Sequence, residues 1–336
     1  MSHSSQNSSA LQAGASAALA LVASDLAAVE AKMRSNEQGI FPPLAEAFLS
    51  LITSGGKRLR PMLALLATRL FAPLSNPAIA LAAAVETLHT ATLVHDDVID
   101  NALIRRGSPT LNASWTSGAT VLAGDYLFAR AAAFAAETGS VRVITLFANT
   151  LRVICEGELR QLAARYRWDQ PKDAYYERIY AKTASLFAAA TEGGAALGAA
   201  AEDDIQRLRD YGYNLGMAFQ IIDDILDFTS TDAALGKPAG SDLRQGTITL
   251  PVFYFMQESA DRRARLDQME DWAAADGHAA TLDLVAQIAQ SSAIVRAYDE
   301  AASFIAQAVA GLQPLPESAA RTALLELAAS TLERRR

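Results

Sequence analysis

Two copies of one acidic pattern, each inside an apolar run, constrain the fold of this chain more than any other feature. Residues 95–100 read His-Asp-Asp-Val-Ile-Asp, and residues 220–227 read Gln-Ile-Ile-Asp-Asp-Ile-Leu-Asp. Each copy places carboxylates at positions i, i+1 and i+4, and positions i and i+4 lie on one face of a helix. Like charges at this spacing repel by about 0.2–0.5 kcal/mol on an exposed helix, and apolar surroundings raise the cost because buried carboxylates need partners. A hard divalent cation is such a partner, and carboxylate oxygens suit Mg²⁺ held beside phosphates.

A single copy of this pattern has a simpler explanation, as a solvated acidic patch or a helix cap, because short motifs often match by chance. Two copies inside helical apolar runs favour a metal site. Calcium buffering is the weaker alternative, since the EF-hand loop with its central glycine is absent from both segments. The sequence therefore predicts an oxygen-ligated metal site that serves a phosphate-bearing substrate.

Helical signals run along the whole chain, and convincing strands are missing. Hydrophobic residues make up 51% of the sequence, and alanine, the best helix former, dominates them. Asn76-Pro77 predicts a helix start, because Asn caps helices and Pro suits the first helical turn. We expect one long helix over about 76–101 and another over about 208–228, each carrying an acidic pattern. The fold class is all-α.

Charge and composition bound the partners and the location. The 336-residue chain has a net charge of −8, which argues against nucleic acid as its main partner. Its single cysteine, Cys155, excludes an intrachain disulfide, and we expect it to be a small core residue. No transmembrane segment is predicted, since Glu86 and His89 interrupt the most apolar run. We expect a cytoplasmic protein with a flexible polar tail over 1–12 and a single all-α domain over 13–336.

Basic residues follow glycine turns or the acidic patterns, where they are placed to bind phosphate. Residues 55–60 read Gly-Gly-Lys-Arg-Leu-Arg, which brings three positive charges next to a backbone that an anion can approach closely. Arg105-Arg106 follows the first acidic pattern, and Lys182-Thr183 and Lys237 supply further donors. Each cluster taken alone is more often a solvated surface. The loops over 105–109 and 229–247 are candidate lids.

Taken in order, these motifs resemble those of the trans-type polyprenyl diphosphate synthases, the long-chain members in particular. The resemblance covers roughly residues 40–255 and closes with Gly236-Lys237-Pro238. It implies the isoprenoid synthase fold, a single-domain antiparallel helix bundle around a deep central cavity, and a homodimer. It also implies condensation of an allylic diphosphate with isopentenyl diphosphate, with three Mg²⁺ ions accompanying the bound diphosphate.

The resemblance also assigns roles to individual positions. Metal binding is implied for Asp96, Asp97, Asp100, Asp223, Asp224 and Asp227. Substrate binding is implied for Lys57, Arg60, His89, Arg105, Arg106, Gln161, Lys182, Thr183, Gln220 and Lys237. Catalytic roles are implied for Asp96, Asp97, Asp100, Arg105, Lys182, Asp223 and Lys237. One position departs from the family pattern: Thr247 stands where many members have Lys, and Arg244 is the expected substitute for that charge.

The helix before Asp96 predicts a long product. Thr92, Leu88 and Val85 lie one, two and three turns before Asp96, at about 5.4 Å a turn. Short-chain members of the family place aromatics four or five residues before the first Asp, where this chain has the small Thr92 and Ala91. We therefore expect the product to pass farnesyl length. We expect the floor of the tunnel to lie deeper, at Phe128 or Phe134, unless these are ordinary core residues.

Three other functions stay open at this point. A geranylgeranyl-length synthase differs only in where the chain stops. A terpene cyclase or head-to-head condensing enzyme shares the aspartate-rich patterns, but the glycine-lysine segment and Lys237 favour the use of isopentenyl diphosphate. A non-catalytic subunit of a heteromeric synthase tends to lose aspartates, and this chain keeps all six.

Overall fold

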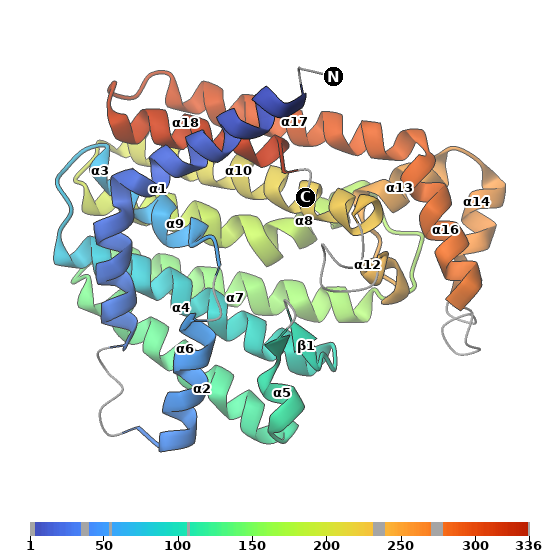
Figure 1. The fold of residues 1–336 in the computed structure, drawn as a ribbon, viewed down its shortest axis with the longest axis horizontal. Coiled ribbons are helices and arrows are strands. Elements are labelled where there is room, and N and C mark those ends of the chain that lie inside the picture. The colour runs from blue at the N-terminus through green and yellow to red at the C-terminus, as the bar shows by residue number, and fades with distance from the viewer. Residues whose placement is uncertain are drawn as a thin grey trace. The chain divides into compact units, whose positions relative to one another are not determined.

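A computed structural model of the chain shows a structure made almost entirely of helices (Figure 1). It describes residues 4–34, 40–53, 56–105, 108–230, 239–269 and 278–334. Within these ranges the strands are the two-residue β1 (Ile104–Arg105) and β2 (Ser108–Pro109), which pair antiparallel. The all-α prediction is confirmed.

The chain packs into two compact units that are interleaved along the sequence. Unit 1 comprises Met1–Leu151, Leu186–Gly212 and Gly311–Leu327, and unit 2 comprises Arg152–Ser185, Tyr213–Ala310 and Ala328–Arg336. The first aspartate pattern belongs to unit 1 and the second to unit 2. The helices α7 (Val141–Ala163), α10 (Glu202–Thr229), α17 (Ser292–Leu312) and α18 (Ala319–Leu332) each contribute to both units.

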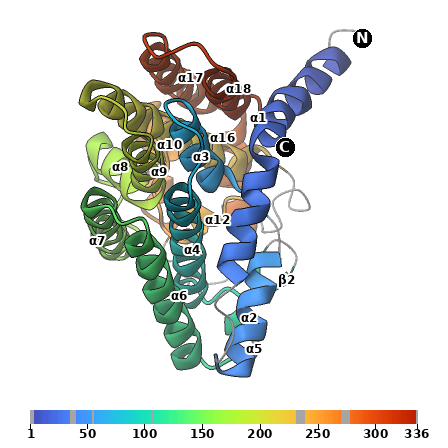
Figure 2. The same cartoon turned by 90° about the vertical axis from the view of Figure 1, so that its left-hand side faces the viewer.

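In unit 1 the other helices pack around α4 (Asn76–Ile99). This helix contacts α6 (Ser117–Glu137), α3 (Leu59–Arg69) and α1 (Ser4–Arg34), and Figure 2 shows α6 on one side of it and α1 on the other. Its alanines 80, 82, 83 and 84 are buried, so small side chains allow neighbouring backbones to come close. A Cβ on Gly124 of α6 would lie 2.2 Å from the His95 ring, so a larger residue there would displace that ring. The remaining helices of unit 1 are α2 (Pro42–Thr53), α5 (Leu111–Ser114) and most of α9 (Ser185–Leu197).

Gly194 of α9 permits close contact between α9 and α3. A Cβ there would lie 2.4 Å from the carbonyl oxygen of Ala64 in α3. The hydroxyl of Thr68 donates a hydrogen bond to the Gly194 carbonyl at 2.9 Å, which joins the same two helices.

Unit 2 is held together by polar contacts across its helices. It contains α8 (Lys172–Ile179), the π-helical turn η1 (Tyr180–Ala184), α12 (Ser241–Arg244), α13 (Leu250–Gln257), α14 (Ala260–Leu266) and α16 (His278–Gln290). Lys172 of α8 donates to the hydroxyl of Tyr254 in α13 at 2.7 Å and forms an ion pair with Glu300 of α17. Arg178 of α8 donates to the carbonyl of Ile248, just before α13.

Several local predictions differ from the structure. Helix α1 begins at Ser4, where a flexible tail over 1–12 was predicted, and the alanines that follow favour its continuation as a helix. Helix α4 has Ser75 at its N-cap, one residue before the predicted Asn76. Helix α10 begins at Glu202, ahead of the predicted 208, with three acidic residues in its first turn that favour a helix N-terminus. Cys155 is exposed and not in the core.

Helix α4 is the one helix in the described ranges with the length and hydropathy to cross a membrane, but 72% of its most apolar window is buried inside the protein. This burial is what a core helix requires.

Candidate active site

The first aspartate pattern ends α4 and divides its carboxylates between two environments. Asp97 is buried, and Arg105 of β1 donates to its Oδ1 at 2.7 Å. Asp96 and Asp100 are half-buried and share the other face of the last turn, where the Asp100 amide donates to the Asp96 carbonyl. Burial raises the pKa of Asp97, with Arg105 partly offsetting it. The half-buried pair is therefore the one positioned to meet a cation.

One of the three basic residues in the glycine-lysine segment (residues 55–60), Arg58, forms ion pairs within the protein. Arg58 has a left-handed backbone (φ 46°), an uncommon conformation for a non-glycine residue. Its guanidinium lies 2.7 Å from the buried Glu86 and 3.1 Å from Glu30. Arg58 thus anchors the segment, which leaves Lys57, exposed, and Arg60 as its phosphate-binding candidates.

Arg60 and His89 lie elsewhere in unit 1. The guanidinium of Arg60 lies 5.0 Å from the ring centre of Phe187 in α9, a cation–π contact that orients the side chain. His89 is half-buried on α4, and its carbonyl accepts a hydrogen bond from the Thr92 hydroxyl at 2.7 Å.

An apolar cavity lies along α4, on the side of the chain-length positions. Its volume is about 20 Å³, roughly the space of one water molecule. Val85 and Leu88 line it, as predicted for the path of a prenyl chain. The other lining residues come from α4, α6, α7 and α9, and are Leu81, Ala84, Ala135, Val143, Leu146, Phe147, Thr150, Leu186 and Ala189.

The predicted floor residues lie outside this cavity. Phe134 is buried in the core beside Arg130, and Phe128 packs edge-on against His95 with ring centres 5.0 Å apart. Phe147 is the aromatic among the described lining residues. Phe147 was not predicted from the sequence, because the spacing of apolar residues in α7 does not indicate which neighbouring helix the Phe147 side chain contacts.

The second aspartate pattern, in α10, is more deeply buried than the first. Asp224 accepts hydrogen bonds from the Tyr175 hydroxyl of α8 and from the Gln220 amide, both at 2.9 Å. Desolvation, and then the nearby charge of Asp242, raise its pKa from 3.8 to about 7. Asp227 is also buried and accepts from the Asp242 amide at 3.2 Å. Asp223 is the half-exposed member, and Arg334 lies 2.9 Å from its Oδ1.

The Lys182-Thr183 pair stands on the π-helical turn η1, an irregularity frequently found at functional sites. Lys182 is exposed, with Glu158 of α7 3.5 Å away. The Thr183 hydroxyl donates to Gln220 Oε1 at 2.6 Å, so it belongs to the same network as Asp224. Gln161 lies half-buried near the end of α7. The structure therefore joins Thr183, Gln220 and Asp224 in one hydrogen-bond network.

The structure adds three residues to this network that were not predicted: Tyr175, Asp242 and Arg334. No local motif marks them, and Tyr175 and Arg334 are more than forty residues from Asp223 and Asp224. Thr247 is buried and its amide donates to the Asp242 carbonyl, while Arg244 presents its backbone carbonyl to the Tyr166 hydroxyl. The predictions for Arg106 and Lys237 lie outside the described residues.

The donor set fits a hard cation that also binds substrate. In the described part of the chain, no three Asp, Glu, His or Cys side chains are gathered closely enough to hold a metal alone. Mg²⁺ is usually bound by one or two carboxylates together with water and substrate phosphates, not by a full protein cage. Half-exposed carboxylates in each unit match that mode of binding: Asp96 and Asp100 in unit 1, and Asp223 in unit 2.

Comparison with known proteins decides the family. The profile of the polyprenyl synthetase family matches residues 42–286. The chain belongs to this family. It is 42% identical over 304 residues to heptaprenyl diphosphate synthase component 2 of Geobacillus stearothermophilus, which covers 90% of this chain and 94% of that protein.

Solved structures agree with this assignment. The chain superposes on a decaprenyl diphosphate synthase from Rhodobacter capsulatus with a TM-score of 0.89 at 39% identity, covering 96% of this chain and 99% of the other. It also resembles a polyprenyl synthase from Caulobacter crescentus complexed with calcium and isoprenyl diphosphate, with a TM-score of 0.87, 39% identity and coverage of 96% and 98%. The predicted isoprenoid synthase fold and the predicted trans-polyprenyl diphosphate synthase activity are confirmed.

Proposed function

We propose that this synthase is Mg²⁺-dependent and extends an allylic diphosphate by successive head-to-tail condensation with isopentenyl diphosphate, beyond farnesyl length. The observation that carries the proposal is the apolar cavity on α4, the helix whose last turn carries Asp96 and whose C-cap is Asp100. Leu88 and Val85, which line it, lie eight and eleven residues before Asp96, or about 12 and 16 Å along the helix. A diphosphate held at the aspartates would direct its hydrocarbon tail along this face.

Asp96, Asp100 and Asp223 would hold the metal, with Asp97, Asp224 and Asp227 fixing the two helix segments that carry them. Bound Mg²⁺ would neutralise the negative charge that develops on the departing diphosphate. Calcium and isoprenyl diphosphate in the Caulobacter crescentus relative support a divalent cation beside a diphosphate in this family. The number of ions, three in our proposal, is testable by metal titration in the presence of a non-cleavable allylic analogue.

The basic residues would divide between the two substrates. Lys57, Arg60, His89 and Arg106 would hold the diphosphate of isopentenyl diphosphate, and Arg105, Lys182 and Lys237 that of the allylic substrate. Such charge-assisted hydrogen bonds are roughly twice as strong as neutral ones. Arg105 already pairs with Asp97, so its guanidinium is held in place before substrate arrives.

The reaction needs no protein nucleophile. The allylic C–O bond breaks with its electron pair leaving on pyrophosphate, and the alkene of isopentenyl diphosphate attacks the resulting carbocation to form a C–C bond. Loss of a proton to pyrophosphate restores a double bond. The apolar side chains along α4 keep water from the cation, and the cationic side chains stabilise the leaving group.

The test is direct. Purified protein is incubated with isopentenyl diphosphate, Mg²⁺ and an allylic primer of two, three or four isoprene units, and the products are separated by chromatography after dephosphorylation. We expect chains longer than farnesyl, no product in the presence of a chelator, and no cyclic hydrocarbon. Linear products that end at geranylgeranyl length would show that the chain is a shorter-chain synthase. Cyclic products would show that it is a terpene cyclase.

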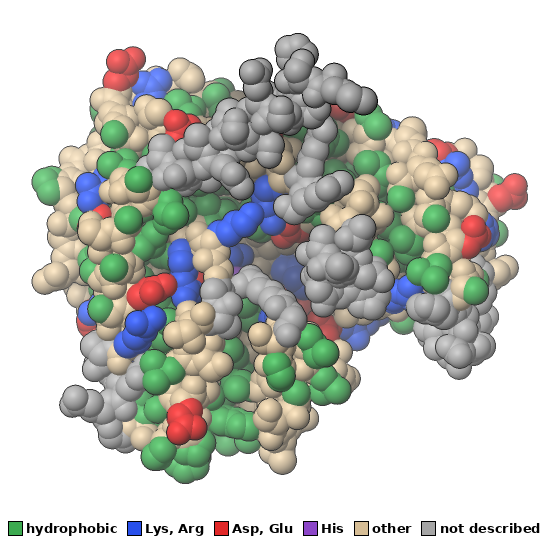
Figure 3. Space-filling view, in the orientation of Figure 1, with side chains coloured by type: hydrophobic (Ala, Val, Ile, Leu, Met, Phe, Trp, Pro, Cys, Tyr) green, Lys and Arg blue, Asp and Glu red, His purple; other side chains and the backbone are tan. Residues whose placement is uncertain are grey.

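The oligomeric state is the second part of the proposal. Large hydrophobic side chains lie exposed in unit 1, among them Val121 and Leu122 of α6, and Figure 3 shows hydrophobic side chains gathered over α2, α5 and α6. We place the homodimer contact there. Size-exclusion chromatography with light scattering should give a dimer, and Leu122→Glu, at a side chain 69% exposed, should give a folded monomer.

A heteromeric enzyme is the alternative, because the Geobacillus stearothermophilus relative is named as component 2 of its synthase. Activity of the purified chain alone would exclude a required second subunit. For the cytoplasmic location, which rests on the soluble substrates, fractionation of cells that express the chain is the measurement.

A further inference from the structure

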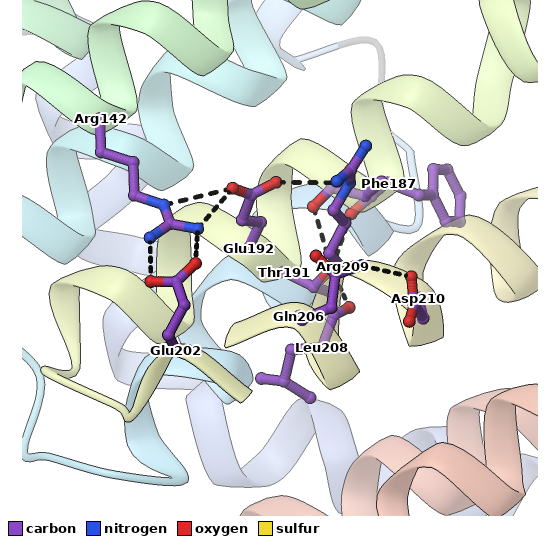
Figure 4. Close-up of polar contacts among 10 residues, drawn as sticks. Arg142, Phe187, Thr191, Glu192, Glu202, Gln206, Leu208, Arg209 and Asp210 are labelled. Carbon is purple, nitrogen blue, oxygen red and sulfur yellow. Dashed lines mark hydrogen bonds and ion pairs between the residues drawn. The ribbon is translucent and has the colours of Figure 1, made fainter. Parts of the chain in front are cut away.

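A network of charged side chains joins α7, α9 and α10 within unit 1 (Figure 4). Arg142, in the first turn of α7, donates to Glu192 of α9 at 2.9 and 3.2 Å and to Glu202 of α10 at 2.7 and 2.8 Å. Arg209 of α10 approaches the other oxygen of Glu192 at 3.8 Å. Glu192 is 8% exposed, whereas the Glu202 side chain is 71% exposed, so the network runs from the interior to solvent.

Helix geometry places the buried end of this network directly beyond the cavity. Leu146 of α7 and Ala189 of α9 both line the cavity. Arg142 precedes Leu146 by four residues and Glu192 follows Ala189 by three, so each stands one turn further along the same helix face. Because Arg142 and Glu192 are hydrogen-bonded to each other, the pair joins α7 and α9 next to Val143, the first lining residue of α7, and one turn past Ala189, the last lining residue of α9.

The same end of the cavity is the one furthest from the aspartates. Leu81 is the lining residue of α4 most distant from Asp96, fifteen residues or about 22 Å along the helix. A Cβ on Gly193, the residue after Glu192, would lie 3.1 Å from the Leu81 side chain. The α9 turn that carries Glu192 therefore packs against the far end of the α4 face.

We infer that the Arg142–Glu192 ion pair is the stop that sets the maximum length of the prenyl product. The inference rests on the proposed function and assigns a specificity-determining role to two charged residues in place of an aromatic floor. Glu202 and Arg209 hold the pair from the solvent side.

An ion pair stops a growing hydrocarbon in a way that apolar side chains do not. The cavity of about 20 Å³ is too small for an isoprene unit, so its Leu, Val and Phe side chains must rotate to admit the chain. Apolar side chains do this without losing a polar partner. An apolar tail that reached the pair would have to break the hydrogen bonds between the buried Glu192 carboxylate and Arg142, whose side chain is 36% exposed, and the desolvation of Glu192 opposes the next condensation.

The decisive variant is Glu192→Ala, assayed with isopentenyl diphosphate, Mg²⁺ and a farnesyl primer. We expect the main product to lengthen by one or more isoprene units. Glu192→Gln keeps the volume and removes the charge, and should give a smaller shift in the same direction. Asp210→Ala is the matched control, since it removes one exposed carboxylate of the same helix surface that appears in Figure 4, and should leave product length unchanged.

A second variant keeps the inference falsifiable if Glu192→Ala does not fold. Ala189→Phe narrows the last apolar turn before the ion pair at a position that is only half-buried, and should shorten the product by at least one unit. Folding of every variant is checked by thermal melting. If Glu192→Ala folds and gives a product of unchanged length, the inference is overturned. If Glu192→Ala does not fold, an unchanged product length from Ala189→Phe overturns it. Failure of the wild-type chain to condense any primer would instead overturn the proposed function.

Discussion

Replacing Asp224 with Asn should abolish the pH dependence of stability that this buried carboxylate imposes on the metal-free protein. Asp224 is 3% exposed, and its pKa is raised to about 7. Between its ordinary value of 3.8 and about 7, the folded protein binds a proton that the unfolded chain has already lost. Stability from this group is therefore fully present below about pH 4 and falls as the pH rises through 7.

The size of the effect follows from the shift and from the hydrogen bonds. A shift of about 3 pH units corresponds to about 4 kcal/mol, at about 1.36 kcal/mol per unit. Asn keeps only one acceptor oxygen for the two donors, Tyr175 and Gln220, and leaving one buried donor unpaired costs about 1–3 kcal/mol. Asp224→Asn should thus raise the free energy of unfolding by about 1–3 kcal/mol at pH 8 and lower it by a similar amount at pH 4.5.

Urea unfolding from pH 4.5 to 8.5, with a chelator present, measures this difference at each pH. Tyr175→Phe is the companion variant, because it removes the donor at 2.9 Å and leaves the carboxyl. Its cost should be larger at pH 8, where the acceptor is charged, than at pH 4.5. A stability difference between Asp224→Asn and wild type that does not change with pH would refute the reasoning.

The remaining predictions concern catalysis. Asp96→Ala should lower turnover at saturating Mg²⁺ at least about a hundredfold without lowering the melting temperature, and near-wild-type turnover would contradict the metal assignment. Lys57→Ala and Arg60→Ala should raise KM for isopentenyl diphosphate more than for the primer, since each contact is worth about 1.5–3 kcal/mol; equal effects in steady-state kinetics would argue against separate diphosphate sites. Thr92→Phe should shorten the product to about three or four isoprene units, because residue 92 lies one turn before Asp96. Ala91→Phe should shorten the product in the same way and should in addition lower the free energy of unfolding by about 1–3 kcal/mol, because Ala91 is fully buried. Wild-type products from folded forms of both would show that this helix does not line the chain's path.

The parts predictable from sequence are those with short-range causes. The apolar periodicity indicated both α4, which is rich in alanine, and α10, and the three-to-four-residue repeat put Val85 and Leu88 on one face. That face lines the apolar cavity. A helix repeat needs no knowledge of partners, so these elements could be read without a structure.

The parts that sequence analysis missed depend on which helices meet. Phe147 lines the cavity, and the Arg142–Glu192 pair lies beside it, only because α7 and α9 pack beside α4; fifty residues separate the two charged residues. Arg58 looked like a third phosphate ligand. Its left-handed backbone turns its side chain toward Glu86 instead. The segment Gly-Gly-Lys-Arg-Leu-Arg does not indicate that Arg58 adopts this conformation.

In both aspartate patterns the carboxylates at i and i+1 differ in burial, and their spacing on the helix explains this difference. A residue at i+1 is turned about 100° from i on a helix, at 3.6 residues a turn. When the carboxylate at position i faces the site, the one at i+1 therefore faces the protein interior. Asp97 is buried and accepts a hydrogen bond from Arg105. Asp224 is buried and accepts hydrogen bonds from Tyr175 and Gln220.

The patterns differ at i+4, and this difference sets what each offers a cation. Asp100 ends α4 and stays half-exposed, so the first pattern presents Asp96 and Asp100. Asp227 is 1% exposed and accepts from the Asp242 amide, so the second pattern presents Asp223. Substitution of Asp100 should therefore weaken metal binding more than substitution of Asp227, whose loss should act first on the stability of the segment it shares with Asp242.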